Sequence, residues 1–274
     1  MKKTATQQFS EMKRRGEKIA ALTAYDYVTA RIADEAGIPL LLVGDSLGMV
    51  VLGYESTLPV TMEEMLHHTR AVARAKPRAV VISDLPFRSY ETPKQSVANA
   101  RRFIEAGADG VKLEGGEAVS AQIRAVIEAG IPVLGHIGLL PQSATSYKLV
   151  GRSTEEAEQL LRDARLLEEA GAFAVVIECV MASLAARISK AVSIPTIGIG
   201  SGSECNGQIL VVHDLLGLTP RMPKHAKRYA QVGKTMKEAF ASYRQDVERG
   251  LFPDSDRCPS DEEDEQGKNY DNEE

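Results

Sequence analysis

The chain has 274 residues, of which 43% are hydrophobic, and its formal net charge is −5. This length suits one large α/β domain or two small ones. Aromatic residues make up only 5% and tryptophan is absent, which argues against a base-stacking surface, while the negative charge disfavours a broad grip on phosphates. We therefore expect no nucleic-acid partner.

The charge is concentrated at the C-terminal end. The last 24 residues carry ten acidic and two basic side chains. Such a run is typical of a solvated, disordered segment. The charge pattern predicts a folded domain over residues 1–252 and an acidic, disordered tail over residues 253–274.

The three cysteines have no CxxC spacing, which indicates a reducing compartment without disulfides or a zinc site. The basic N-terminal stretch is not followed by the apolar run of a signal peptide. No apolar run approaches the roughly 20 residues that span a bilayer. We expect a cytoplasmic protein with no membrane partner.

Short apolar runs alternate with helical patterns along the chain, as is typical of parallel strands buried on both faces. Before four of these runs stands a glycine suited to the left-handed residue that ends a helix: Gly37, Gly107, Gly130 and Gly171. The runs predict eight strands, at residues 19–24, 40–44, 79–83, 110–113, 132–135, 174–177, 196–199 and 209–212.

Helix starts can also be recognised. Thr61 with Glu64, and Ser153 with Glu156, have the spacing of a capping box, and Pro93 suits a first helical position. Eight β/α alternations predict an α/β fold, a closed (β/α)8 TIM barrel, with an extra N-terminal helix and a long helix after residue 223. The rival doubly wound sheet is disfavoured because no GxGxxG follows the first strand.

The active site of such a barrel lies at the C-terminal ends of its strands. Ionisable groups are costly to bury there unless they pair or bind something. The ionisable and hydroxyl residues at or just beyond the predicted strand ends are therefore candidates for the site: Asp45, Ser46, Asp84, Lys112, Glu114, His136, Glu178, Cys179, His213 and Asp214.

Three carboxylates, Asp45, Asp84 and Glu114, follow three successive strands. Neighbouring strands are roughly 4.8 Å apart, so these groups would repel one another unless a cation lay between them. Oxygen ligands suit Mg2+, which commonly uses one or two carboxylates with waters and substrate. The alternative is that each carboxylate caps a helix or pairs with an arginine.

Lys112 is two residues before Glu114, so both side chains point to the same side of their strand. Beside a metal, Lys112 could hold a substrate carboxylate, or form a Schiff base if desolvated. The carboxylate contact is favoured because nearby acids would keep the amine protonated. A salt bridge of Lys112 with Glu114 or Asp84 is the structural alternative.

Glu178 lies among apolar residues in AVVIECV, an environment that suits a general base working near neutral pH. Pairing with a strand-seven or strand-eight partner is the alternative. Cys179 should face away from the barrel bore, because adjacent strand residues point in opposite directions. His136 could donate to a developing oxyanion, orient a ligand, or have only a structural role.

Several segments resemble the ketopantoate hydroxymethyltransferase family. They extend from Thr23 to Ala230, nearly the whole predicted barrel, and include VGDSLGMV, DLPF, VKLEGG, PVLGHIGLLPQS, ECV and IPTIGIGSG. The resemblance implies a (β/α)8 barrel of the phosphoenolpyruvate/pyruvate type, usually a homodecamer. It also implies Mg2+, with 5,10-methylenetetrahydrofolate as co-substrate.

The implied reaction transfers a hydroxymethyl group to 3-methyl-2-oxobutanoate, giving 2-dehydropantoate for pantothenate and coenzyme A biosynthesis. By the same resemblance, Asp45 and Asp84 are metal ligands, and Glu114 completes the metal site. The 2-oxo acid is contacted by Asp45, Ser46, Asp84 and Lys112, and Glu178 is the proton acceptor.

Two other functions remain open. One is a related metal-dependent carbon–carbon lyase or mutase, although such enzymes typically carry a reactive cysteine on a mobile loop. The other is a non-catalytic scaffold, which need not retain all of these site residues together.

Overall fold

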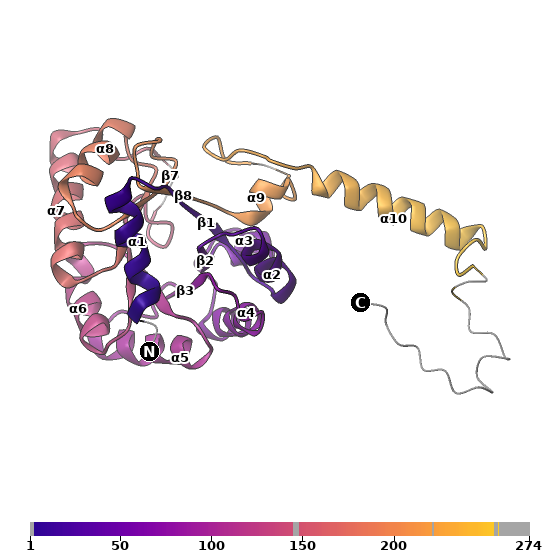
Figure 1. Cartoon of the computed structure of the whole chain (residues 1–274), viewed down its shortest axis with the longest axis horizontal. Helices are drawn as coiled ribbons and strands as arrows, with labels where there is room; N and C mark the ends of the chain where they lie inside the picture. Colours follow the sequence, from indigo (N-terminus) through magenta and orange to yellow (C-terminus); the bar gives the residue numbers. More distant parts are fainter. Residues whose placement is uncertain (1–2, 145–147, 221, 255–256, 258–274) are drawn as a thin grey trace.

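Eight parallel strands close into a barrel in chain order (Figure 1). The computed structural model describes residues 3–144, 148–220, 222–254 and 257. The strands are β1 (Ile19–Thr23), β2 (Leu40–Val43), β3 (Val80–Asp84), β4 (Gly110–Glu114), β5 (Val133–Gly138), β6 (Ala174–Glu178), β7 (Thr196–Ile199) and β8 (Gly207–Leu210). The predicted (β/α)8 barrel is confirmed.

Six predicted strands match within one residue at each end, the fifth ends three residues later than predicted, and the eighth is displaced by two residues at both ends. Pairing with β1 starts at Ile19 opposite Gly207, so β8 begins two residues earlier than predicted. The strand ends before Val212, whose N–H donates to Oγ1 of Thr23 and which begins the helix α9 (Val212–Leu216). His213 and Asp214 therefore belong to α9 rather than to a strand end.

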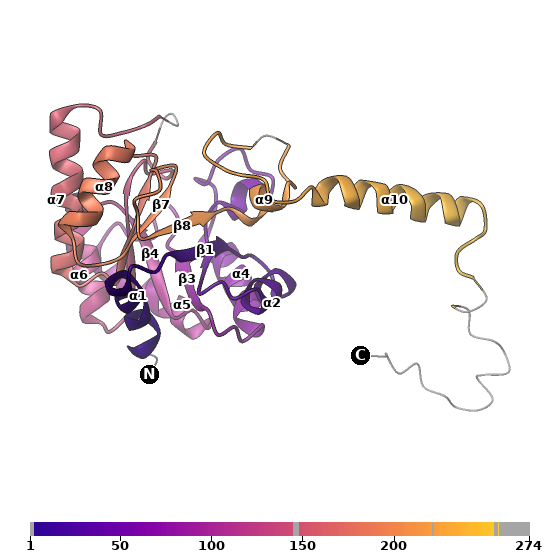
Figure 2. The same cartoon turned by 45° about the horizontal axis from the view of Figure 1, so that its top comes forward.

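Helices surround the barrel and connect successive strands (Figure 2). The described loop of residues 200–206, between β7 and β8, contains no helix. The connecting helices are α2 (Tyr27–Glu35), α3 (Leu47–Val50), α4 (Met62–Arg74), α5 (Pro93–Glu105), the 3-10 turn η1 (Glu117–Val119), α6 (Ser120–Glu128), α7 (Thr154–Ala170) and α8 (Ala182–Ala191).

The residues predicted to cap the helices do so, but one of the two predicted capping boxes is incomplete. Thr61 and Glu64 form a complete capping box at α4, and Thr92 caps α5, which has proline in its first turn. Ser153 caps α7, but the Glu156 carboxylate accepts from the N–H groups of residues 151 and 152 instead of closing the box. The four glycines predicted to end helices all have φ between 80° and 103°.

The predicted N-terminal helix α1 (Lys3–Arg15) covers the end of the barrel where the strands begin. Phe9 is buried against Ile19 and other bore residues, and its ring stacks with that of Phe173 at 6.0 Å. Nζ of Lys13 donates to three carbonyl oxygens at the end of α8 and the loop that follows. Closure of this end leaves the opposite mouth of the barrel for ligands.

The long helix α10 (Val232–Glu248) projects away from the barrel in both views (Figures 1 and 2). None of its residues is buried. Its exposed large apolar side chains recur at helical spacing: Met236, Phe240, Tyr243 and Val247. No helix in the described part of the chain is long and apolar enough to cross a membrane. Nearly all of the predicted tail lies outside the described residues.

Candidate active site

Strand register brings the predicted site residues onto neighbouring strands at the open mouth. Asp84 of β3 pairs with Lys112 of β4, and Glu114 of β4 pairs with His136 of β5. Glu178 ends β6. On β3 and β6 the residues two positions earlier, Ile82 and Val176, belong to the core inside the barrel. Strand alternation therefore turns these ionisable side chains toward the bore.

Asp45 and Ser46 lie just beyond the end of β2. Asp45 is only 5% exposed, and its N–H donates to Oδ2 of Asp84 at 3.2 Å. The Ser46 hydroxyl lies 2.9 Å from the hydroxyl of Tyr25, a buried residue just past β1. The turn after β2 thus places Asp45 beside the end of β3 and the Ser46 hydroxyl beside a residue just past β1.

Lys112 forms the salt bridge that the sequence left as an alternative. Its Nζ lies 2.5 Å from Oδ1 of Asp84 and 3.9 Å from Oε1 of Glu114. Burial opposes the charge of Lys112, but these carboxylates and Asp45 outweigh burial and raise the pKa of the ammonium. A lysine held so firmly protonated is unsuited to Schiff-base chemistry and well suited to binding an anion.

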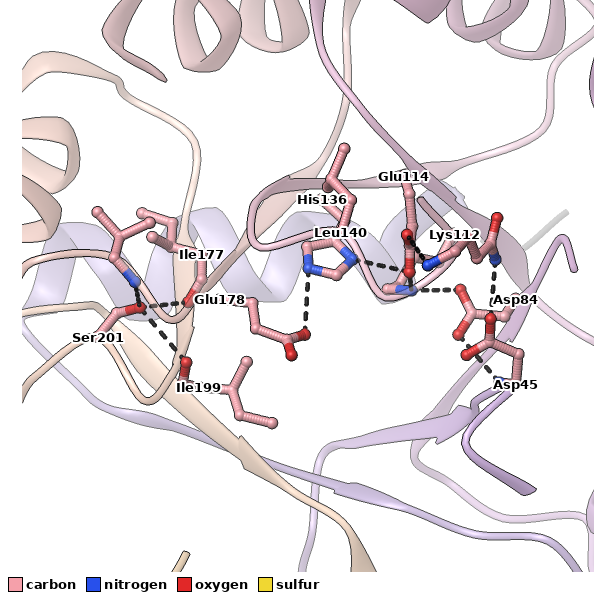
Figure 3. A network of polar contacts seen from close by, with 12 residues as sticks. Asp45, Asp84, Lys112, Glu114, His136, Leu140, Ile177, Glu178, Ile199 and Ser201 are labelled. Carbon is pink, nitrogen blue, oxygen red and sulfur yellow. Dashed lines mark hydrogen bonds and ion pairs between the residues drawn. The ribbon is translucent and has the colours of Figure 1, made fainter. Parts of the chain in front are cut away.

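His136 lies between two carboxylates (Figure 3). Its Nδ1 is 3.5 Å from Oε1 of Glu114, and its Nε2 is 3.3 Å from Oε2 of Glu178. Neither ring nitrogen has the geometry of a hydrogen bond to another protein atom. Burial and Lys112 disfavour the imidazolium, yet the two carboxylates raise the pKa of His136 to about 9. Glu178 is therefore linked to Glu114 through a charged ring.

Glu178 is the most accessible of these carboxylates. Its side chain is 13% exposed, against 2% for Glu114. Gly138 on β5 permits the close approach of its backbone, because a Cβ on Gly138 would lie 2.3 Å from the Glu178 carbonyl oxygen. Gly138 also has a φ of 101°, which disfavours a side chain. The predicted base therefore faces the mouth from a tightly fixed strand end.

Cys179 follows Glu178 and has a φ of 49°, so it lies outside the regular strand. Its thiol is half-buried, and burial together with the Glu178 charge raises the pKa of Cys179 to about 11. A thiol that stays protonated at neutral pH is a poor nucleophile.

Sequence reasoning missed Gln142, a buried residue in the loop between β5 and α7. Its side-chain NH2 donates to Oδ2 of Asp45 at 2.8 Å, and its backbone N–H donates to Oε2 of Glu114 at 3.0 Å. The only available signal was its place in the GLLPQS segment just after a strand whose end carries chemistry. Tyr25, the partner of Ser46, was missed for the same reason: it lies in a loop.

Comparison with known proteins decides the family. The model of a family described as ketopantoate hydroxymethyltransferase matches residues 3–255. The chain belongs to this family.

Curated relatives in the ketopantoate hydroxymethyltransferase family match over nearly their whole length. A 3-methyl-2-oxobutanoate hydroxymethyltransferase of Moorella thermoacetica is 55% identical, covering 91% of this chain and 95% of the relative. One from Carboxydothermus hydrogenoformans is 53% identical, covering 93% and 94%. The family assignment therefore applies to the barrel and not to one motif.

Solved structures with low identity support the fold alone. A phosphonopyruvate hydrolase superposes with a TM-score of 0.63 at 16% identity, covering 96% of this chain and 94% of the other. A 2,3-dimethylmalate lyase, described as a member of the PEP mutase/isocitrate lyase superfamily, gives 0.55 at 15% identity, covering 93% and 92%. These likenesses show the same barrel fold.

The charge balance of this ketopantoate hydroxymethyltransferase site fits a divalent cation. Four carboxylates face one lysine and one histidine at the mouth. Burial and the Asp84 charge raise the pKa of Asp45 to about 8, and burial also raises the pKa of Asp84. An acidic group that retains its proton in the metal-free protein near neutral pH, as Asp45 does, would release it to a bound cation.

The carboxylates at the mouth have different partners. Among the described residues, no three His, Cys, Asp or Glu side chains are already grouped as a metal site. Asp45 and Asp84 are neighbours through the Asp45 N–H, whereas Glu114 is held by Gln142 and lies near His136. Mg2+ commonly uses one or two carboxylates and keeps several waters, so this donor set fits that ion.

Proposed function

We propose that this chain transfers a hydroxymethyl group from 5,10-methylenetetrahydrofolate to 3-methyl-2-oxobutanoate, giving 2-dehydropantoate. The observation that carries the proposal is the pairing, in one barrel mouth, of an accessible carboxylate, Glu178, with the buried carboxylates Asp45 and Asp84. Enolisation uses a base that removes a proton from carbon and a cation that stabilises the negative charge formed. The names of the curated relatives supply the substrate.

Asp45 and Asp84 would hold the Mg2+, and Glu114 would complete the site from further away. A phosphonopyruvate hydrolase of this fold, 14% identical, is described in complex with oxalate and Mg2+. When bound here, the ion would act as a Lewis acid on the 2-oxo acid and make its C3–H more acidic.

The chain's own residues then do the rest. Lys112 and the Ser46 hydroxyl bind and orient the 2-oxo acid at the mouth. Glu178 takes the C3 proton, and the His136 ring holds the carboxylate in position for this transfer. The C3 carbanion forms a bond to the methylene carbon of the folate. Both carbon–nitrogen bonds of that methylene group break, water supplies the hydroxyl oxygen, and the C3 proton and one proton of the water replace the carbon on the two folate nitrogens. No covalent enzyme intermediate is needed.

We also propose that the protein is a homo-oligomer, with the decamer resting on family resemblance. The apolar face of α10, whose large side chains remain exposed, supports assembly. The reducing compartment expected from the cysteines makes the cytoplasm the proposed location. Sedimentation of the full chain at several concentrations measures the assembly.

The test of function is C3 proton exchange of 3-methyl-2-oxobutanoate in D2O, followed by NMR with Mg2+ and with EDTA. Exchange that requires Mg2+ supports a cation site joined to a base. Formation of 2-dehydropantoate on adding the folate completes the assignment. A folded protein that yields no 2-dehydropantoate with both substrates and Mg2+ would refute it and would favour the scaffold.

A further inference from the structure

Gln142 connects the ends of three strands from a single loop position. Its Nε2 donates to Oδ2 of Asp45 at 2.8 Å and to the Leu85 carbonyl at 2.9 Å. Its backbone N–H donates to Oε2 of Glu114 at 3.0 Å. The residue is 3% exposed, so these contacts are made away from water. One side chain and its own backbone thus hold carboxylates that follow β2 and end β4.

Tyr90 sets the orientation of the Gln142 amide. The Tyr90 hydroxyl donates to Oε1 of Gln142 at 2.6 Å. The Leu85 carbonyl can only accept, so the NH2 side of the amide faces Leu85 and Asp45 and the carbonyl side faces the Tyr90 hydroxyl. Both amide protons and the amide oxygen have partners, and a flipped amide would place its oxygen against the Leu85 carbonyl and lose that bond.

The side chain of Gln142 is neutral, and this neutrality matters beside Asp45. A lysine at position 142 would neutralise Asp45 and compete with a cation for it, and a glutamate would repel it. The neutral amide restrains Oδ2 of Asp45 and adds no charge that would repel or replace a cation. Lys112, by contrast, already neutralises Asp84.

We propose that Gln142 is a positioning residue that holds Asp45 and Glu114 in the arrangement that receives the divalent cation, and that Tyr90 holds Gln142 in turn. The inference rests on the proposed function, because it assigns Gln142 to the cation site of that reaction. Partners of metal ligands generally matter in this way, and removing one typically costs about 10- to 100-fold in metal affinity or activity.

The test measures the Mg2+ dissociation constant of the substrate-free full chain by titration calorimetry. Gln142→Met keeps the length of the side chain, removes its side-chain hydrogen bonds and leaves the backbone N–H that Glu114 accepts. Tyr90→Phe removes only the hydroxyl that donates to the amide oxygen. The matched control is Gln122→Met, a glutamine on α6 whose Nε2 makes an exposed bond to the Glu91 carbonyl. Thermal unfolding without metal is recorded for every variant.

We expect Gln142→Met to weaken Mg2+ binding by at least about tenfold, and Tyr90→Phe to weaken it less. The double variant should bind Mg2+ no more weakly than Gln142→Met alone, because Tyr90 acts through Gln142. The turnover of Gln142→Met, expressed as a fraction of the wild-type turnover, should be higher at saturating Mg2+ than at low Mg2+. If Gln142→Met does not fold, the effect of Tyr90→Phe on Mg2+ affinity decides.

A folded Gln142→Met protein with wild-type Mg2+ affinity would overturn the inference and leave the proposed function intact. A wild-type chain that binds no Mg2+ and shows no metal-dependent C3 exchange would overturn both. A loss of thermal stability with unchanged Mg2+ affinity would show that Gln142 only packs the loop.

Discussion

Nε2 of His136 lies 3.3 Å from Oε2 of Glu178, and the two side chains come from the neighbouring strands β5 and β6. On its other side, the same ring lies 3.5 Å from Glu114. The carboxylate that would take the substrate proton is therefore fixed by a ring that also contacts the proposed cation site. A change at either residue should affect proton transfer.

Replacing Glu178 by glutamine should reduce C3 proton exchange by about 10²- to 10⁴-fold, the usual contribution of a general base. The amide keeps the shape of the side chain but cannot accept the proton. Exchange is measured by NMR in D2O with Mg2+, and Glu169→Gln, an exposed position on α7, is the control. Native-rate exchange in Glu178→Gln would show that another group is the base.

The stabilising contribution of His136 should disappear at alkaline pH. Its pKa is raised from about 6.5 in the unfolded chain to about 9 in the folded one, so the contribution is complete below the first value and lost as pH rises through the second. The stability gap between wild type and His136→Gln should narrow by up to about 3 kcal/mol from pH 6 to pH 9.5. Urea unfolding in EDTA measures it, and a constant gap would contradict the assigned charge.

Lys112→Met should destabilise the metal-free protein by about 3–5 kcal/mol, because it leaves Asp84 and Glu114 buried without their cation. Added Mg2+ should restore part of this loss by binding the folded state. Urea unfolding with and without Mg2+ measures both effects. Lys94→Met, exposed on α5, should stay within about 0.5 kcal/mol of wild type. A similarly small effect of Lys112→Met would show that the ion pair contributes little.

Cys179→Ser should leave turnover unchanged. The pKa of this thiol is raised to about 11 by burial, so almost no thiolate is present at neutral pH. Turnover of the two substrates is compared with that of the wild-type protein. Loss of turnover in a folded Cys179→Ser variant would instead favour chemistry that uses a cysteine, as expected of the lyase alternative.

A chain ending at residue 252 should retain turnover and thermal stability if the acidic segment 253–274 is separate from the catalytic domain. The comparison is made at equal Mg2+ concentrations, because ten carboxylates can themselves bind the ion weakly. A fall in turnover at saturating Mg2+ would assign the segment a role in catalysis.

The barrel and most of its site were predictable because both depend on strand alternation. Asp84, Lys112, Glu114 and Glu178 lie at strand ends that apolar runs mark in the sequence, and their register then brings them together. Runs of β-branched and aliphatic residues locate a buried strand, but they do not locate its last residue. His213 illustrates this limit, since a helix begins immediately before it.

The loop contributions could not be read in the same way. Gln142 and Tyr90 meet from different loops, and no periodic pattern relates them. Whether Lys112 pairs with Asp84 or remains free to bind a substrate depends on interatomic distances, which the sequence does not give. Side-chain partners outside regular elements therefore had to come from the structure.

Closure of the barrel has a consequence for how this protein can change in evolution. Asp84 with Lys112 and Glu114 with His136 are paired by register in a ring whose strands all have two neighbours. Inserting one residue in β4 would turn Lys112 and Glu114 outward and bring aliphatic residues into the mouth. We expect lineages to accept insertions and deletions in the loops and to keep strand lengths constant, so catalysis and folding select against the same mutations.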